Sequence, residues 1–335
     1  MKKVAVTIIL VVLFTTFITV VTPLNSVTAN MAAPFGYGGS GGNFIVNPKS
    51  VLEVNKEDIV FEIGGIAIVN GKDYEQPNYI FAHITYQIVN SGDDAEFTFI
   101  FPALDPIKIG DNKYDFKVTS SEKEISYEAK NAYELKNLFE DEAEYAKIVE
   151  LTSFNDRVYF DPLTGEGYLP QFKGGNFEKV FFVFNIFLKK GITTEVKVDF
   201  KSYAGFDNRR YQKQIYHYFY FLNVNDFYKK FENIKISIIY PKDYPLKANF
   251  AGDIVESGNK KILTIVLKRN FSNLSFSYMQ GKISKVGIFF YKHFPFFYGE
   301  GFGFLLLLVI FPLLIIVSVA FIIYRLVKVR KNEKR

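Results

Sequence analysis

Several segments of the chain alternate apolar with polar residues, which is the pattern of a β-strand with one buried face. In the segment HITYQIV, the apolar residues Ile84, Tyr86 and Ile88 fall on one face, with polar residues between them. The same alternation occurs in three further segments: EFTFIF at 96–101, TEVKVDF at 194–200 and IKISIIY at 234–240. Pro102 follows the first of these three, and it is expected to end that strand because proline has no N–H to donate.

One segment is apolar at nearly every position. Residues 180–188 read VFFVFNIFL, as is typical of a strand buried on both faces. Turn signals such as Lys189-Lys190-Gly191 separate the β-rich segments at short intervals. Many short strands divided by such turns favour a β-sandwich. The sequence therefore predicts an all-β ectodomain of two β-sandwich-like domains, at 44–172 and 173–281.

A helix is predicted within the first of these domains. Residues 131–151 read NAYELKNLFEDEAEYAKIVEL and contain neither glycine nor proline. An apolar stripe at helical spacing runs from Leu135 to Val149. Asn131 can cap the first turn with its side chain. We expect one helix over 131–151, inserted into the β-rich domain.

The C-terminal end of the chain predicts a membrane anchor. Residues 301–324 read GFGFLLLLVIFPLLIIVSVAFIIY without a charged side chain, and six basic residues and one acid follow in 325–335. About 20 apolar residues in a helix cross a hydrocarbon core, and a basic flank marks the cytoplasmic side. We expect a single transmembrane helix at 301–324, a cytoplasmic tail at 325–335, and an aromatic and basic juxtamembrane segment at 282–300 that contacts membrane lipid.

The N-terminal end predicts export. Lys2 and Lys3 precede an apolar run, and the small residues Val27-Thr28-Ala29 follow Pro23. This order is typical of a signal peptide, here 1–29 with cleavage after Ala29. The apolar run is longer than usual, which leaves an uncleaved anchor as the alternative. Both interpretations place the middle of the chain outside the cell, at the plasma membrane.

The net positive charge of the chain comes from its two ends. The whole sequence has 40 basic and 35 acidic residues, a net charge of +5. Setting aside Lys2, Lys3 and the six bases and one acid of the tail leaves 32 basic and 34 acidic residues, a net charge of −2. A nearly neutral ectodomain argues against a nucleic-acid partner.

Residues 30–43 form a Gly-rich leader, which we expect to be a flexible lead-in. Its residues match two catalytic or nucleotide-binding motifs, G-x-G-x-x-G from Gly36 to Gly41 and G-x-S-x-G from Gly38 to Gly42. Both motifs require a strand before them and a helix after them. No helical periodicity follows the leader, so we interpret both matches as coincidental.

The residues that could carry chemistry are scattered. His83, His217 and His293 lie far apart and belong to no metal-binding spacing, so we expect the first two on the surface and His293 in the membrane-proximal belt. The chain has no cysteine, which excludes a cysteine nucleophile and disulfides.

The acidic residues give no site either. Glu140, Asp141, Glu142 and Glu144 are interpreted as a solvated helix face because no cation-binding loop accompanies them, and 161–166 is interpreted as a β-turn. The sequence thus predicts no catalytic, cofactor-binding or metal-binding residues, and no cofactor. A pair of carboxylates that meets only in the fold remains open.

From His83 to Gly205 the chain contains, in order, the segments ITYQIVN, EFTFIFP, DEAEYAK and VFNIFLKKGITTEVKVDF. This order resembles the VIT domain, the β-sandwich of inter-alpha-trypsin inhibitor heavy chains and of vault poly-ADP-ribose polymerase. The resemblance covers about a third of the chain and implies a β-sandwich. In that family a D-x-S-x-S metal site usually follows, and this chain lacks it. The general layout also resembles exported single-span proteins of low-GC Gram-positive bacteria.

These patterns predict a non-enzymatic, single-pass bacterial cell-surface protein. Its β-rich ectodomain is expected to bind a protein partner or to support an envelope complex, and the transmembrane helix could contact a partner as well. Two alternatives remain open at the level of sequence. One is an envelope-anchored hydrolase acting on glycans, and the other is an accessory subunit of a transporter or secretion system.

Overall fold

A computed structural model of the chain describes residues 35–36, 40–42, 45–47, 51–69, 72–104, 106–110, 113–139, 141–151, 158–168, 179–207, 214–222, 227–268, 272–281 and 311–332. The chain divides into two compact units. The unit that we call the β unit spans Phe35–Asp207 and Lys213–Lys282 and contains the described strands. The other unit contains helix α6 (Phe311–Asn332).

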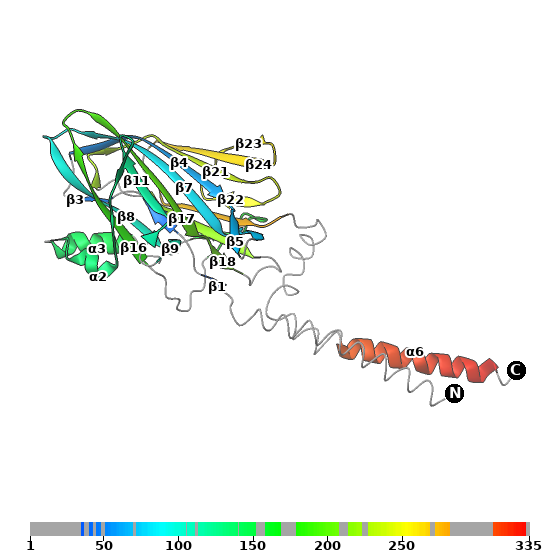
Figure 1. The fold of residues 1–335 in the computed structure, drawn as a ribbon. Helices are drawn as coiled ribbons and strands as arrows, with labels where there is room; N and C mark the ends of the chain where they lie inside the picture. Colours follow the sequence, from blue (N-terminus) through cyan, green and yellow to red (C-terminus); the bar gives the residue numbers. More distant parts are fainter. Residues whose placement is uncertain are drawn as a thin grey trace. The chain divides into compact units, whose positions relative to one another are not determined.

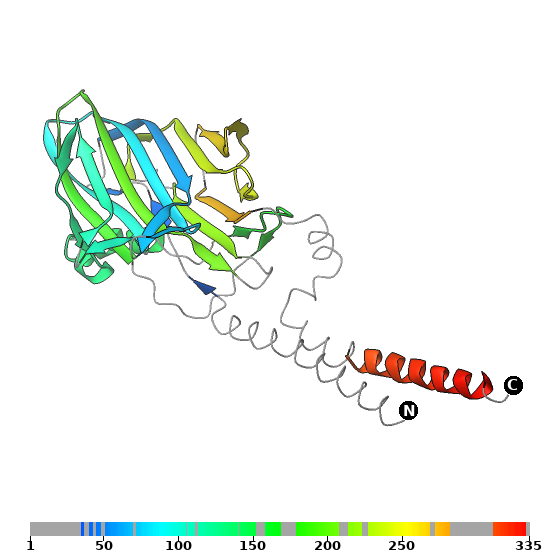
Figure 2. The same cartoon turned by 45° about the vertical axis from the view of Figure 1, so that its right-hand side comes forward.

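The described strands of the β unit form two large sheets, which Figures 1 and 2 show from two directions. The nine-stranded sheet runs in the order β12-β11-β17-β7-β4-β21-β24-β23, and β20 also pairs with β4. Its strands are β4 (Leu52–Ile63), β7 (Tyr79–Asn90), β11 (Phe116–Ser120), β12 (Lys123–Ile125), β17 (Thr193–Tyr203), β20 (Lys230–Phe231), β21 (Ile234–Pro241), β23 (Asp253–Ser257) and β24 (Lys260–Leu267).

The ten-stranded sheet runs in the order β1-β18-β19-β2-β8-β16-β13, with β3, β22 and β25 attached to it. Its strands are β1 (Phe35–Gly36), β2 (Ser40–Gly42), β3 (Ile45–Asn47), β8 (Ala95–Leu104), β13 (Glu128–Lys130), β16 (Lys179–Leu188), β18 (Gly205–Asp207), β19 (Ile215–Phe221), β22 (Leu246–Ala248) and β25 (Leu274–Met279). Three small hairpins complete the β structure: β5 (Ile66–Val69) with β6 (Lys72–Glu75), β9 (Lys108–Gly110) with β10 (Lys113–Tyr114), and β14 (Tyr159–Phe160) with β15 (Gly167–Tyr168).

The core lies between the two large sheets and is rich in aromatic rings. Phe61 of the nine-stranded sheet contacts Tyr218, Tyr220 and Phe276 of the ten-stranded sheet, with ring centroids 5.3 to 5.7 Å apart. Tilted and edge-on contacts of this kind are the preferred arrangement of aromatic pairs. The alternating residues of β7, β17 and β21 point into this core, as the sequence predicts. The two sheets therefore form a β-sandwich.

The predicted end of a strand at Pro102 is wrong. Strand β8 continues through Pro102 to Leu104, and Pro102 pairs with Phe181 of β16. On its other side, β3 pairs with β8 up to Ile100, and β2 pairs with it from Ala103. Pro102 falls between these two short partners, so its missing N–H coincides with a change of neighbouring strand.

The two predicted sandwich domains are not separate in the structure. Strand β17, from the second predicted domain, pairs with β7 and β11 from the first, and β16 pairs with β8 along its full length. Strand β21 likewise pairs with β4. Both sheets thus mix strands from before and after residue 172. Local patterns identified the strands, but pairing between distant strands decides the domain boundary.

The predicted helix over 131–151 is divided into two. Helix α2 (Ala132–Lys136) begins at Asn131, whose side chain accepts a hydrogen bond from the N–H of Glu134 while the Glu134 carboxylate accepts one from Asn131 N–H. This capping box confirms the predicted helix start. Asn137 caps the C-terminus of α2, and α3 (Glu142–Leu151) begins five residues later. The interruption leaves Leu135 buried but Leu138 exposed.

The described part of the Gly-rich leader is also different from the prediction. Strand β1 pairs with β18, and β2 lies between β19 and β8 within the ten-stranded sheet. The leader is therefore part of the sandwich at these residues rather than a flexible lead-in. Ser40 lies in β2, so the G-x-S-x-G match has no helix directly after its serine, in agreement with the interpretation that it is coincidental.

Helix α6 covers the second half of the predicted transmembrane segment and most of the basic tail. The segment 301–310, the juxtamembrane segment 282–300 and the predicted signal peptide lie outside the described residues. Among the helices that are described, none has both the length and the apolar character that crossing a membrane demands.

Candidate functional site

The outer face of the nine-stranded sheet carries a broad array of polar and aromatic side chains. We call it the open face and define it by the outward residues of its strands, such as Val60 on β4, His83 on β7, Asp199 on β17, Lys117 on β11 and Ser237 on β21. These five residues form one row across the sheet through successive strand pairs. Val60 and Ser237 are partly exposed, and the other three side chains are about half exposed. Within the described residues no helix or sheet packs over this row.

The centre of the open face holds a histidine and a carboxylate in direct contact. His83 Nδ1 lies 2.6 Å from an oxygen of Asp199, and each side chain is 51% exposed. The two residues are directly opposite each other on β7 and β17, so the register of the sheet brings them together. His83 is therefore on the surface, as the sequence predicts. Its pairing with Asp199 could not be read from the sequence, because the two residues are more than a hundred positions apart.

An aromatic cluster lies at one end of the same two strands. Tyr79 of β7 is opposite Tyr203 of β17, with ring centroids 5.3 Å apart, and Tyr79 also contacts Phe81 at 6.4 Å. Lys201 Nζ lies 4.8 Å from the centroid of the Phe81 ring. Partial burial, followed by the hydrogen bond to Tyr79, raises the pKa of Tyr203. The cluster offers apolar surface and hydroxyl groups beside a cation.

A glycine allows the chain to pass close to this cluster. A Cβ added at Gly65 would come within 2.9 Å of the Phe81 ring and 3.3 Å of Tyr79. The backbone of Gly65 therefore packs against these two rings, and its carbonyl accepts a hydrogen bond from Gln76 N–H. The close approach holds the aromatic side chains in place from one side.

The outer face of the ten-stranded sheet is covered, in contrast. Helix α2 contacts β16 and β13, and the β14–β15 hairpin contacts β25. Figure 1 shows α2 and α3 beside β8 and β16. Phe181 and Val183 of β16, which alternate with the inward residues, are buried on this face. This double burial confirms the prediction for the first part of the run at 180–188. Asn185 and Phe187, further along the outer side of β16, are exposed.

The prediction that His217 is a surface residue is wrong. The side chain is only 4% exposed, because Tyr159 of β14 stacks on its ring with centroids 4.2 Å apart. His217 Nδ1 lies 2.8 Å from Ser277 Oγ, and Ser277 also accepts a hydrogen bond from Phe160 N–H. A serine and a histidine are thus in contact, but Ser277 is fully buried beneath the hairpin. Their evident role is to attach the hairpin to the sheet. His293 lies outside the described residues.

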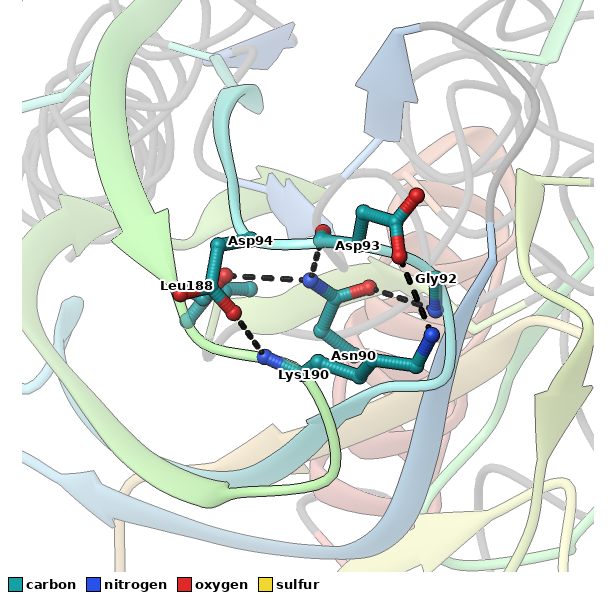
Figure 3. A network of polar contacts seen from close by, with 6 residues as sticks. All are labelled: Asn90, Gly92, Asp93, Asp94, Leu188 and Lys190. Carbon is teal, nitrogen blue, oxygen red and sulfur yellow. Dashed lines mark hydrogen bonds and ion pairs between the residues drawn. The ribbon is translucent and has the colours of Figure 1, made fainter.

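Turns at one end of the sandwich are joined by a polar network, shown in Figure 3. The buried Asn90 side chain donates hydrogen bonds to the carbonyls of Asp93 and Leu188, and its oxygen accepts one from Gly92 N–H. Lys190 N–H donates to the Asp94 carboxylate, and Lys190 Nζ lies 3.0 Å from Asp93. The network ties the turn after β7 to the turn after β16, which belong to different sheets.

The acidic residues of the predicted helix and turn contact other parts of the protein where the structure describes them. Glu142 forms an ion pair with Lys136, which lowers the Glu142 pKa through the hydrogen bond and the charge. Asp161 accepts hydrogen bonds from the N–H groups of Leu163 and Thr164, which confirms the predicted turn. Among the described residues, no group of three or more histidine or acidic side chains is placed to hold a metal ion. Glu140 lies outside them.

A carboxylate is enclosed within the core itself. Glu57 points inward from β4 and is fully buried beside Tyr86, Tyr220 and Tyr228. Burial is the main cause that raises the pKa of each of these three tyrosines, and the nearby Glu57 charge raises it further. Counting back from Ile59 and Phe61 places Glu57 on the inward side. A β-bulge between Val54 and Lys56 shifts the alternation, so counting forward from Leu52 would have placed Glu57 outward. The site is closed to solvent and does not form part of the open face.

Comparison with known proteins yields structural matches only. No protein-family model and no characterised protein sequence matches the chain. A protein of Legionella pneumophila named for nutrient binding has a TM-score of 0.49 and 14% identity, covering 81% of this chain and 79% of that one. An M1 zinc metallopeptidase of Deinococcus radiodurans has a TM-score of 0.32 and 9% identity over 67% of this chain and 42% of that one.

Leukotriene A4 hydrolase of Saccharomyces cerevisiae gives a similar result, with a TM-score of 0.32 and 10% identity over 70% of this chain and 30% of that one. This chain spans less than half of the metallopeptidase and of the hydrolase. These matches assign neither a family nor an activity to the chain.

Proposed function

We propose that the chain is a single-pass cell-surface protein whose β unit binds a protein partner through the open face, without catalysis. The observation that carries the proposal is the contrast between the two outer faces. One is covered in part by α2 and the β14–β15 hairpin, whereas the other presents His83, Asp199 and the Tyr79 cluster to solvent. Conformationally restricted aromatic and charged side chains on a rigid sheet suit recognition because little entropy is lost when a partner binds.

The sequence supports the membrane part of the proposal. The uncharged run at 301–324 and the basic residues after it match the requirements of a span with a cytoplasmic tail. Helix α6 exposes large apolar side chains on several sides, a pattern that suits a lipid environment rather than water: Leu314, Ile316, Val317, Val319, Phe321, Ile323 and Tyr324. On this proposal the β unit lies outside the cell.

The placement is tested by adding protease to intact cells that carry the chain with a tag at its C-terminus. We expect the β unit to be cleaved while the tagged tail stays protected until lysis. Recovery of the intact protein from the soluble fraction without detergent would contradict the proposed anchor.

The binding role is tested by cross-linking on intact cells followed by purification and mass spectrometry. Thr85→Arg places a long cation on the open face beside His83, and Glu96→Arg places the same side chain on β8, at an exposed position of the ten-stranded sheet. We expect Thr85→Arg to lose a cross-linked protein that wild type and Glu96→Arg both retain. Equal recovery from all three chains would contradict a role of the open face.

A further inference from the structure

Strand β23 ends the nine-stranded sheet and is exposed along its whole length. Each of its five residues is exposed, and the two apolar ones, Ile254 and Val255, are 58% and 59% exposed on opposite faces of the sheet. Figure 1 shows β23 beside β24 as the last strand of the sheet. Within the described residues no strand pairs with its free edge. An edge strand of this kind is a template for pairing with another strand.

The opposite end of the same sheet is protected in the usual way. Strand β12 has only three residues, and two of them, Lys123 and Glu124, are exposed and charged. Short length and charge discourage pairing at an edge. Strand β23 also has two charged residues, Asp253 and Glu256, but it is longer than β12 and carries two adjacent exposed β-branched side chains. Such side chains favour strand pairing.

The turn after β23 determines which backbone groups are available. Ser257 pairs with Lys260 across a two-residue loop, and Gly258 has φ of +60° at its first position, as in a type II′ turn. The pair that closes such a loop is hydrogen-bonded, so Ser257, Val255 and Asp253 direct their N–H and C=O groups toward β24. The groups of Ile254 and Glu256 therefore point to the free edge.

We propose that β23 pairs antiparallel with β23 of a second copy of this chain, with the two-fold axis at Val255. This register places Ile254 opposite Glu256 of the second copy, so the backbone groups that point to the edge meet each other. Asp253 is then opposite Ser257, and no two like charges are directly opposed. A shift by one residue in either direction would misalign the free N–H and C=O groups, and one of the two shifts would also oppose Asp253 with Glu256.

The outward side chains support the same arrangement. Val255 pairs with Ile262 of β24, and Ile262 pairs with Ile239 of β21, which forms an apolar row on the open face. In the paired form the two Val255 side chains meet at the axis, and the row continues into the second copy. The exposed end of the apolar row is thereby covered. Glu256, on the other side of the sheet, keeps its ion pairs with Lys242 and Lys261.

Pairing through one short strand from each copy buries a small area, so we expect a weak, concentration-dependent dimer. It does not depend on binding of a partner to the open face. The two proposals can therefore fail separately, since the Thr85→Arg variant leaves β23 unchanged.

The chain has no cysteine, so a single introduced thiol reports directly on the proposed axis. At Val255 the two copies form a non-hydrogen-bonded pair, with Cβ atoms about 4.5–5.5 Å apart, close enough for a disulfide after a small adjustment. Full-length Val255→Cys in membranes is treated with a mild oxidant and analysed without reductant. The control is Val266→Cys, an equally exposed position one strand further in.

We expect Val255→Cys to give a band at twice the chain mass, at least about fivefold stronger than Val266→Cys, because only the former lies at the axis. Equal bands, or a cross-linked product with a mass other than twice the chain, would overturn the second-copy assignment. The second result would indicate a strand from a different protein.

A second variant tests the pairing itself. Adding Ile254→Pro to Val255→Cys removes an edge-directed N–H that β24 does not use, so the hairpin is expected to remain. The cross-link should fall to the level of the Val266→Cys control.

The register is checked by mixing Asp253→Cys chains with Ser257→Cys chains. The mixture should form more cross-linked dimer than either variant alone. The proposed strand pairing would be contradicted if the Val255→Cys cross-link persisted with Ile254→Pro, or if the mixture gave no more cross-linked dimer than either variant alone.

Discussion

Each of the two sheets has a contact between a histidine and an oxygen-bearing side chain on its outer face, and this contact is buried on one sheet and exposed on the other. On the ten-stranded sheet His217 lies 2.8 Å from Ser277, buried under the β14–β15 hairpin. On the nine-stranded sheet His83 lies 2.6 Å from Asp199, with half of each side chain exposed. The buried pair excludes water, so losing one partner leaves the other unsatisfied. The exposed pair can exchange its partner for water at little cost, which leaves it available for recognition.

The difference between the faces is visible in the strands that build them. The first half of β16 is apolar and buried on both sides because its outer side is covered there, whereas β7 alternates because its outer side is not covered. A covered face must contribute to stability, whereas an open face is free to serve other purposes. The predictions below test this division by comparing matched substitutions on the two faces.

The largest difference is expected between two phenylalanines. Phe181→Ala removes a fully buried ring from the covered face and is expected to lower the free energy of unfolding by about 3–5 kcal/mol. Phe81→Ala on the open face removes a half-buried ring and is expected to cost about 1 kcal/mol. Urea denaturation followed by tyrosine fluorescence measures both, since the chain has no tryptophan. Equal losses would show that the open face is also covered.

A smaller difference is expected between two hydroxyl groups. Ser277→Ala removes the partner of both Phe160 N–H and His217, which remain enclosed, and should cost about 1–3 kcal/mol. Thr85→Ala on the open face should change the free energy of unfolding by no more than about 0.5 kcal/mol. The same denaturation experiment applies. A neutral Ser277→Ala would mean that the hairpin is not held through this hydroxyl.

Alkaline pH should destabilise the interior more than the open face. Burial raises the pKa of Tyr278 well above its usual value, so above pH 10 the unfolded chain loses this proton first and stability falls as the pH rises. Each such tyrosine contributes a slope of about 1.4 kcal/mol per pH unit. Tyr278→Phe should make the decline in the unfolding midpoint above about pH 10 shallower, and Tyr203→Phe should change it less. Identical slopes in both variants would contradict the difference in burial.

A small effect is also expected at the centre of the open face. His83→Ala should change the free energy of unfolding by less than about 1 kcal/mol, because a contact between two half-exposed polar side chains contributes little. His217→Ala, its counterpart on the covered face, should cost more. Thermal unfolding of the two variants side by side makes the comparison. A large loss from His83→Ala would assign the His83–Asp199 pair a structural role.

Much of the strand content could be predicted from the sequence because it depends on local periodicity. The alternation in β7, β17 and β21 and the continuous apolar run in β16 give the correct strands and the correct inward faces. The helix start at Asn131 was also predictable, since a capping box is a local signal. The break after Lys136 was not, because no glycine or proline marks it.

The candidate site required the register between distant strands. Asp199 meets His83 only because β17 pairs with β7, and Tyr203 meets Tyr79 for the same reason. His217 looks like any other polar residue in an aromatic strand until the β14–β15 hairpin is placed over it. The Gly-rich leader gave no strand signal of its own, since its position in β2 is decided by the neighbours β19 and β8.

The parallel pairing of β4 with β21 has a consequence for the order of folding. Strand β4 lies near the beginning of the β unit and β21 near its end, and β2 depends in the same way on β19. A contact between residues so far apart closes a long loop, which slows folding. During synthesis the first strands must wait, unpaired on this side, until most of the chain has emerged. A fragment that stops before residue 234 lacks β21, which pairs with one edge of β4. That edge of β4 would then be exposed and prone to aggregation.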